Sequence, residues 1–113
     1  MKIENPHKFF SDLGDLHDAR IGEIRWSQSD GSIHIFVDDL QSNFTETTGY
    51  RGARPAELIF DDLRSFQFEV PSMSGHLSIY EILVEESDML SVSIKIAPFG
   101  LISFQCSKIS LIQ

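Results

Sequence analysis

The sequence predicts an α+β fold in which a short N-terminal helix packs on a curved antiparallel β-sheet. Helical spacing of apolar residues is confined to the segment before Gly14, whereas several later segments alternate apolar and polar residues. Alternation with a period of two buries one face of a strand and exposes the other to solvent, which is typical of antiparallel sheets. The chain has 113 residues, 42% of them hydrophobic, and this suits one domain spanning 1–113.

The predicted helix begins at Pro6. Asn5 is a suitable N-cap residue, and Pro6 fits the first helical position, where its missing N–H costs nothing. Gly14 is placed to end the helix in a left-handed conformation. Because a helix this short is marginal alone, its apolar side should dock on the sheet. That side carries Phe9, Phe10 and Leu13.

The rest of the chain predicts a meander of six or seven strands. A hairpin is indicated at Asp30-Gly31, since this pair supplies the positive φ angles of a two-residue turn. Slips of the apolar phase near Gly22 and between Phe104 and Ile109 indicate bulges that would curve the sheet. The strands are expected near 19–27, 33–39, 56–61, 64–70, 77–86, 89–97 and 101–106, with an extension toward 112.

We expect the helix and the sheet to share one hydrophobic core. We also expect a cytoplasmic protein, for the following reasons. Cys106 is the one cysteine, so the chain forms no internal disulfide, and its place in an alternating strand predicts burial. No apolar run is long enough for a signal peptide or a membrane helix, so we expect no membrane partner. The expected core residues are Phe9, Phe10, Trp26, Phe66, Phe68, Val92 and Phe104.

The charge is acidic and unevenly distributed. A formal charge of −8 argues against a nucleic-acid partner, which usually needs a basic patch. Segment 57–88 holds eight acidic residues and one basic residue, and we expect it to make one side of the molecule acidic. Such imbalance often only maintains solubility, but it would also attract a basic protein partner. The candidate binding residues in this segment are Glu81, Glu85 and Asp88.

A second candidate region is the polar, Gly-containing segment 41–55, which has no sustained period and predicts a long loop. Loops of this length in a compact domain are commonly functional. Tyr50, Arg51 and Arg54 are therefore candidate binding residues for an anionic ligand or an acidic patch. Alternatively, the two arginines are solvated or pair with the chain's own carboxylates.

A third candidate is the cluster of His17, Asp15 and Asp18, which offers imidazole and carboxylate ligands for a divalent metal. This interpretation would make the chain a metal-binding protein or a small hydrolase. In the alternative, the aspartates accept backbone N–H bonds in the turn and His17 bridges helix and sheet. No G-x-S-x-G elbow or phosphate-binding glycine motif occurs, so we expect no cofactor and treat His34 as an ordinary strand residue.

Four short motifs lie in about the first two-thirds of the chain: 14–21 (GDLHDARI), the Gly-containing hairpin, 58–60 (LIF) and 62–66 (DLRSF). Together they resemble small bacterial β-sheet domains, some of which are similar to immunity proteins of polymorphic toxin systems. The resemblance implies a non-enzymatic cytoplasmic protein that binds a toxin and blocks it. The leading hypothesis is therefore an interaction module, a monomer or homodimer, with a basic toxin-like partner. A homodimer formed through a sheet edge is a further alternative.

Overall fold

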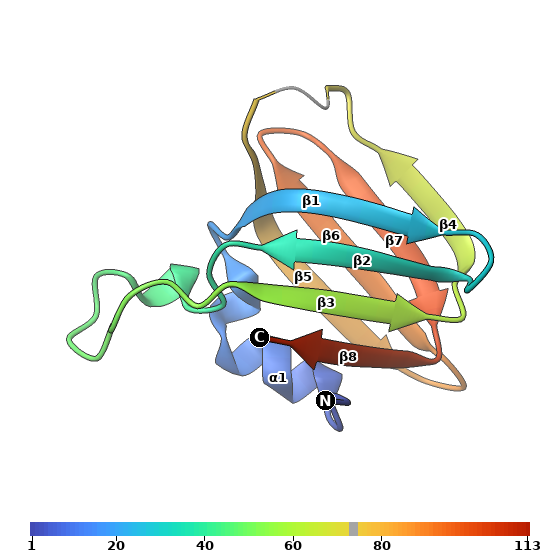
Figure 1. Cartoon of the computed structure of the whole chain (residues 1–113), viewed down its shortest axis with the longest axis horizontal. Helices are drawn as coiled ribbons and strands as arrows, with labels where there is room; N and C mark the ends of the chain where they lie inside the picture. Colours follow the sequence, from blue (N-terminus) through green and yellow to red (C-terminus); the bar gives the residue numbers. More distant parts are fainter. Residues whose placement is uncertain (73–74) are drawn as a thin grey trace.

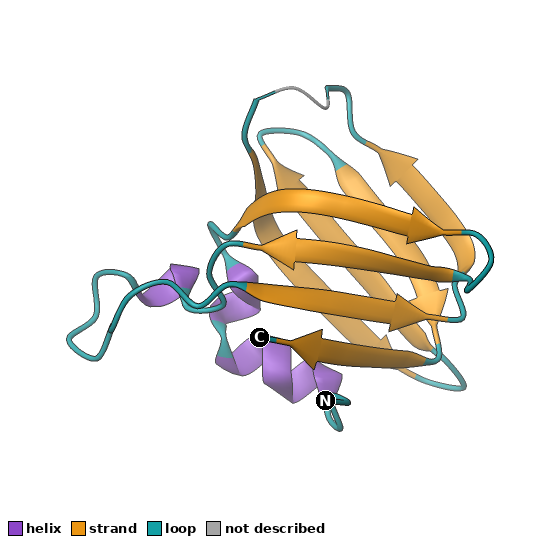
Figure 2. Cartoon of the chain, in the orientation of Figure 1, coloured by secondary structure: helices purple, strands orange, loops and turns teal. Residues whose placement is uncertain are grey.

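The computed structural model describes residues 1–72 and 75–113, which form one α-helix, two 3-10 helices and one antiparallel sheet (Figure 2). Helix α1 spans Pro6–Asp12, and the 3-10 helices η1 and η2 span Gly14–Leu16 and Ser42–Phe44. The strands are β1 (Arg20–Ser27), β2 (Ser32–Val37), β3 (Ala56–Asp61), β4 (Arg64–Glu69), β5 (Leu77–Glu86), β6 (Leu90–Ala97), β7 (Leu101–Cys106) and β8 (Lys108–Ile112).

The sheet folds over into two layers, with strand order β4-β7-β6-β5-β1-β2-β3-β8. Figure 1 shows β1, β2, β3 and β8 in the front layer and β5, β6, β7 and β4 behind them. The layers join where Arg20 and Ile21 of β1 pair with Ser78 and Leu77 of β5. Their inner faces pack against each other, as shown by the rings of Phe60 in β3 and Phe104 in β7, 5.0 Å apart.

Two β-bulges lie beside this junction. The register of β1 shifts between Ile21 and Glu23, and the register of β5 shifts between Ile79 and Glu81. A bulge bends its strand and increases the local twist, so a pair of them beside the shared residues turns the sheet back on itself. The bulge predicted near Gly22 is confirmed.

The predicted helix is also confirmed. The Asn5 side chain accepts a hydrogen bond from the backbone N–H of Lys8 at 3.2 Å, and Gly14 follows the helix with φ of 65°. Helix α1 lies against β5, where the His7 Nδ1 is 3.2 Å from the Val84 carbonyl oxygen (Figure 1). Phe10 is 1% exposed and anchors the helix to the core. No helix in the described part of the chain has the length and apolar character needed to cross a membrane.

The strands are eight, and they do not form one meander. Strand β8 pairs with β3, and β4 pairs with β7. The expected extension of 101–106 breaks at Ser107, whose N–H donates to the Asp61 carbonyl at 2.9 Å and whose hydroxyl donates to the Asp62 carboxylate. The phase slip after Phe104 is thus a strand break that carries the chain from the back layer to the front.

The Asp30-Gly31 hairpin is present, but its loop is longer than predicted. Ser27 pairs with Ser32, which leaves a loop from Gln28 to Gly31. Gly31 has φ of 65°, whereas Asp30 does not have a positive φ. One glycine therefore supplies the left-handed conformation that this loop requires.

The predicted core is partly wrong. Val92 and Phe104 are buried, and so is Cys106, whose thiol pKa is raised to about 12 by burial. Trp26, however, is 63% exposed, and Phe66 and Phe68 are 40% and 39% exposed. Strand β4 is an edge of the sheet, and β1 pairs with β5 only at Arg20 and Ile21, so the aromatic side chains of these strands have fewer strand neighbours to cover them.

The buried anchor of α1 gives a test of this architecture. Replacing Phe10→Ala should lower the free energy of unfolding by about 3–5 kcal/mol, because it opens a cavity between α1 and the sheet. Phe99→Ala is the matched control, since Phe99 is 75% exposed. Urea unfolding followed by circular dichroism measures both, and equal small losses would contradict the docking of the helix.

Candidate functional site

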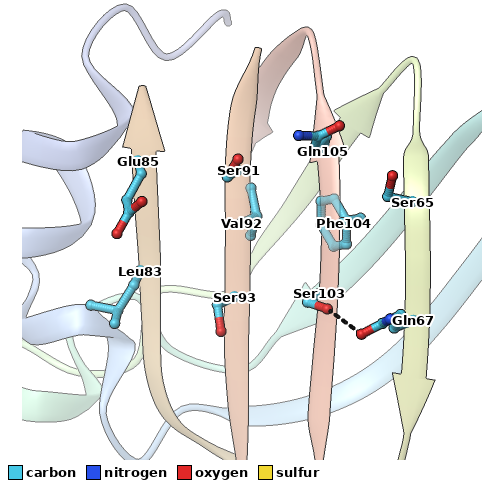
Figure 3. A pocket seen from close by; sticks show the side chains of 10 residues that line it. All are labelled: Ser65, Gln67, Leu83, Glu85, Ser91, Val92, Ser93, Ser103, Phe104 and Gln105. Atoms are coloured by element: carbon cyan, nitrogen blue, oxygen red, sulfur yellow. Dashed lines mark hydrogen bonds between the residues drawn. The ribbon is translucent and has the colours of Figure 1, made fainter. Parts of the chain in front are cut away.

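The outer face of the back layer is the broadest candidate surface. Alternate residues of β4, β7, β6 and β5 point away from the core and line a shallow groove with a volume of about 510 Å³ (Figure 3). Pairing across the strands sets its rows, since Leu83 lies opposite Ser93 and Ser93 lies opposite Ser103. Besides the buried Val92 and Phe104, which belong to the core, the groove is lined by Ser65, Gln67, Leu83, Glu85, Ser91, Ser93, Ser103 and Gln105.

Hydroxyls and amides dominate this groove. The Ser103 hydroxyl donates to Gln67 Oε1 at 3.4 Å, the one hydrogen bond drawn between the residues in Figure 3. Leu83 is 42% exposed at the β5 side of the groove (Figure 3). A surface that combines hydrogen-bonding groups with an exposed apolar contact is chemically suited to a protein partner.

The three candidate acidic residues lie in different settings. Glu81 and Glu85 are on the outer face of β5, about 13 Å apart along the strand, while Asp88 lies in the turn after β5. The Glu81 carboxylate is 2.9 Å from the Lys95 ammonium, and this hydrogen bond and charge raise the pKa of Lys95. Glu85 and Asp88 have no ion-pair partner within the described residues.

The acidic segment 57–88 does not form one side of the molecule as predicted. It runs through β3 in the front layer and then through β4 and β5, which are not neighbours in the sheet. In the front layer, Glu57 pairs with His34 and Asp61 lies 3.8 Å from Lys108. Of the acids without an ion-pair partner among the described residues, Glu85 lines the groove, whereas Glu86 and Asp88 line a neighbouring hollow with Lys2 and Lys108.

The 41–55 loop is organised by Asp39, a residue that the sequence reasoning missed. Asp39 Oδ1 accepts the backbone N–H of Gln41 at 2.8 Å and of Arg54 at 2.9 Å, and Oδ2 accepts the Tyr50 hydroxyl at 2.6 Å. Burial alone would raise the pKa of Asp39, but these hydrogen bonds outweigh it and lower that pKa. The same hydrogen bond raises the pKa of Tyr50.

Tyr50, Arg51 and Arg54 lie at one hollow of the surface. They line a hollow of about 370 Å³ between the loop and the end of α1, where Asp12 also lies. Neither arginine has an ion-pair partner in the part of the chain that the structure describes. The two guanidinium groups would suit an anionic group, whereas the Tyr50 hydroxyl is already used to hold the loop.

His17 has a structural contact at the junction of the layers. Its Nδ1 lies 2.8 Å from the carbonyl oxygen of Tyr80, and because a carbonyl only accepts, the Nδ1–H is the donor. The bridge that the alternative interpretation expected between His17 and the sheet is thus present. The other ring nitrogen, Nε2, is 3.5 Å from Asp18 Oδ1.

Asp15 and Asp18 contribute mainly through their backbones. Both have positive φ, 57° and 71°, in the turn that leads into β1. The backbone N–H of Asp18 donates to the Ile79 carbonyl at 2.9 Å. No three His, Cys, Asp or Glu side chains within residues 1–72 and 75–113 are grouped to hold a metal ion, and a metal site at His17 stays a prediction without a gathered ligand set.

The outer face of the front layer holds a hydrogen-bond chain that the sequence reasoning missed. His34 Nδ1 lies 2.5 Å from Glu57 Oε2, and Nε2 lies 3.4 Å from the Ser32 hydroxyl. This is the connectivity of a hydrolytic triad. Ser32, however, is 1% exposed, so its hydroxyl cannot reach a substrate in this structure. The chain therefore fits the role of satisfying buried polar groups, and the pairing of β2 with β3 is the signal that would have revealed it.

The His17 contact can be separated from metal binding. Replacing His17→Ala should lower the free energy of unfolding by about 1–2 kcal/mol through loss of the Tyr80 hydrogen bond. His76→Ala is the control, since His76 is exposed. Thermal unfolding with and without Zn²⁺ distinguishes the two roles. If Zn²⁺ stabilised the wild type far more than the His17→Ala variant, the metal interpretation would be favoured.

Asp39 predicts how the stability of the loop depends on pH. Its pKa in the folded state is below the ordinary value of 3.8, so its stabilising effect is complete above about pH 4 and is lost as the pH falls through the lowered pKa. Asp39→Asn should cost about 1–2 kcal/mol at neutral pH and less in acid. Asp88→Asn serves as control in urea unfolding at several pH values, and a pH-independent difference for Asp39→Asn would contradict this assignment.

The comparisons with known proteins add no relative. No family model, curated protein or solved structure matches this chain. The resemblance to immunity-like domains therefore stays a prediction from short sequence motifs. The candidate site rests on the groove, the loop and the charges of the chain itself.

Proposed function

We propose that this chain is a protein-interaction module that binds a basic protein through the outer face of its back layer. The partner is of the kind that the resemblance to immunity proteins implies, a toxin that is bound and blocked without chemical change. The proposed setting is the bacterial cytoplasm. The free, buried Cys106 fits that setting because such a thiol stays reduced there.

The observation that carries the proposal is the groove across β4, β7, β6 and β5. It presents serine hydroxyls and glutamine amides in rows fixed by the strand register, beside the exposed Leu83. A rigid sheet holds these groups in place before binding, so little ordering entropy is lost when a partner arrives. Their hydrogen-bonding capacity gives specificity, and Leu83 offers an apolar contact.

Negative charge at one end of the groove favours a positively charged partner. Glu85 lines the groove, and Glu86 and Asp88 follow it at the β5–β6 turn. Lys95 does not cancel these charges because it is paired with Glu81. Arg64 lies on the β4 side of the same row, so the acidic surface is confined to the β5 side of the groove. This acidic side would speed the approach of a basic surface and disfavour an acidic one.

The charge contribution predicts a specific loss of binding. The double variant Glu85→Lys/Asp88→Lys should slow association with the partner about tenfold at low salt, because it reverses the charge at the end of the groove. Glu81 is left unchanged, since its replacement would break the pair with Lys95. Binding is measured by capture of the partner from the native host, followed by surface plasmon resonance with the purified partner.

The matched control is Glu46→Lys/Asp30→Lys, which makes the same change in net charge on the 41–55 loop and the β1–β2 hairpin, at acids without an ion-pair partner among the described residues. It should bind as the wild type does. Added salt should reduce the difference between the wild type and the first variant, since exposed charges are screened over about 8 Å at physiological ionic strength. Equal binding by both variants, with both folded, would rule out the acidic end as the docking site.

A further inference from the structure

The two edge strands of the sheet, β8 and β4, differ in how far their backbones are covered. The edge of β8 is covered by the N-terminal segment, since the Leu111 N–H donates to the Met1 carbonyl at 2.8 Å and the Ile3 N–H donates to the Ile109 carbonyl at 2.9 Å. Strand β4 forms the other edge, pairs with β7, and has six exposed residues in succession. An uncovered edge leaves a row of backbone N–H and C=O groups free to pair with another strand.

The β4 edge also exposes aromatic surface. The rings of Phe66 and Phe68 stack with centroids 6.4 Å apart, and Phe66 stacks in turn on the buried Phe104 at 5.9 Å. Both rings are about 40% exposed, as noted above. Burying half-exposed aromatic rings beside a free strand edge would add a hydrophobic contribution to the pairing of backbones.

Opposite charges lie at the two ends of this strand. Arg64 begins β4 and Glu69 ends it, and neither has an ion-pair partner among the described residues. Arg64 lies opposite Gln105, which lines the outer groove, and Glu69 is two residues after Gln67, which lines it too. Both charges therefore belong to the outer face of β4. An antiparallel copy of the same strand would present each charge to its opposite.

We propose that β4 pairs with β4 of a second copy of this chain across a two-fold axis, giving a homodimer. Gln67 lies opposite Gln67 of the second copy, and Phe66 lies opposite Phe68 on the inner face. Ser65 lies opposite Glu69 on the outer face, within reach of the neighbouring Arg64. The Phe66–Phe68 and Ser65–Glu69 contacts each occur twice and the Gln67 pair lies on the two-fold axis, as the symmetry of such an interface requires.

The side chains favour this register over registers shifted by one or two residues. A shift of one residue would place a phenylalanine opposite a polar residue of the other face, which the pleat does not allow. The register that pairs Phe66 with Phe66 would place Arg64 opposite Phe68, and the register that pairs Phe68 with Phe68 would leave Arg64 far from Glu69. The proposed register combines cross-strand aromatic pairs with two ion pairs, both of which stabilise antiparallel pairing.

The dimer should be reversible. A bulge between Arg64 and Gln67 limits regular pairing to a few residues of each strand. Such an interface is smaller than the roughly 800 Å² per partner of stable complexes, so the dimer should form only as the concentration rises. Its formation would extend the groove-bearing layer from one copy into the next.

Sedimentation velocity over about 1 μM to about 1 mM tests this proposal, a range in which a weak dimer dissociates measurably. The wild type should pass from monomer to dimer. Arg64→Glu and Glu69→Arg should each weaken the dimer about tenfold, because each places two like-charged pairs at the interface. The double variant Arg64→Glu/Glu69→Arg exchanges the charges and should restore association.

A second variant and a control test whether association depends on the β4 edge. Phe68→Lys should abolish association, while Ile112→Lys on the covered β8 edge should leave it unchanged; circular dichroism checks that both fold. A monomer at every concentration would overturn the proposal. So would a dimer that persists in Phe68→Lys, or single charge variants whose loss the exchanged pair does not rescue.

Discussion

The junction between β1 and β5 is the constraint on which the rest of the structure depends. The Asp18 N–H donates to the Ile79 carbonyl, and the Ile79 N–H donates to the Ala19 carbonyl at 2.7 Å. The His17 ring satisfies the carbonyl of Tyr80, the residue displaced by the bulge of β5. A bulge leaves backbone groups out of the ladder, and the His17 ring supplies a hydrogen-bond donor to one of them beside the bend.

The candidate groove follows from that bend. Because the sheet turns back on itself, alternate residues of every strand face the core and the others face water. The outward set of the back layer becomes the polar groove beside Leu83. Strand β1 parts from β5 after Ile21 and β4 is an edge strand, which leaves Trp26, Phe66 and Phe68 partly exposed.

Local sequence patterns predicted much of the fold, and the predictions that were wrong share one cause. Asn5 and Gly14 marked the helix ends, and alternation placed seven strands within a few residues of their bounds. The eighth strand was missed because alternation does not reveal which neighbour a strand takes, and the chain changes layers at Ser107. Of the candidate site residues, Tyr50, Arg51 and Arg54 line one hollow. Asp39 was missed because one of its hydrogen-bond partners, Arg54, is 15 residues away in the sequence.

The sequence by itself determined the class of fold, the burial of Cys106, the helix ends and which residues of a strand share a face. These depend on contacts between residues a few positions apart, which spacing records directly. Tertiary structure alone decided the strand order, the pairing of Glu81 with Lys95, the Asp39 network and the exposure of Phe66 and Phe68. Those features depend on which distant strands become neighbours, and periodicity within one strand carries no information about that choice.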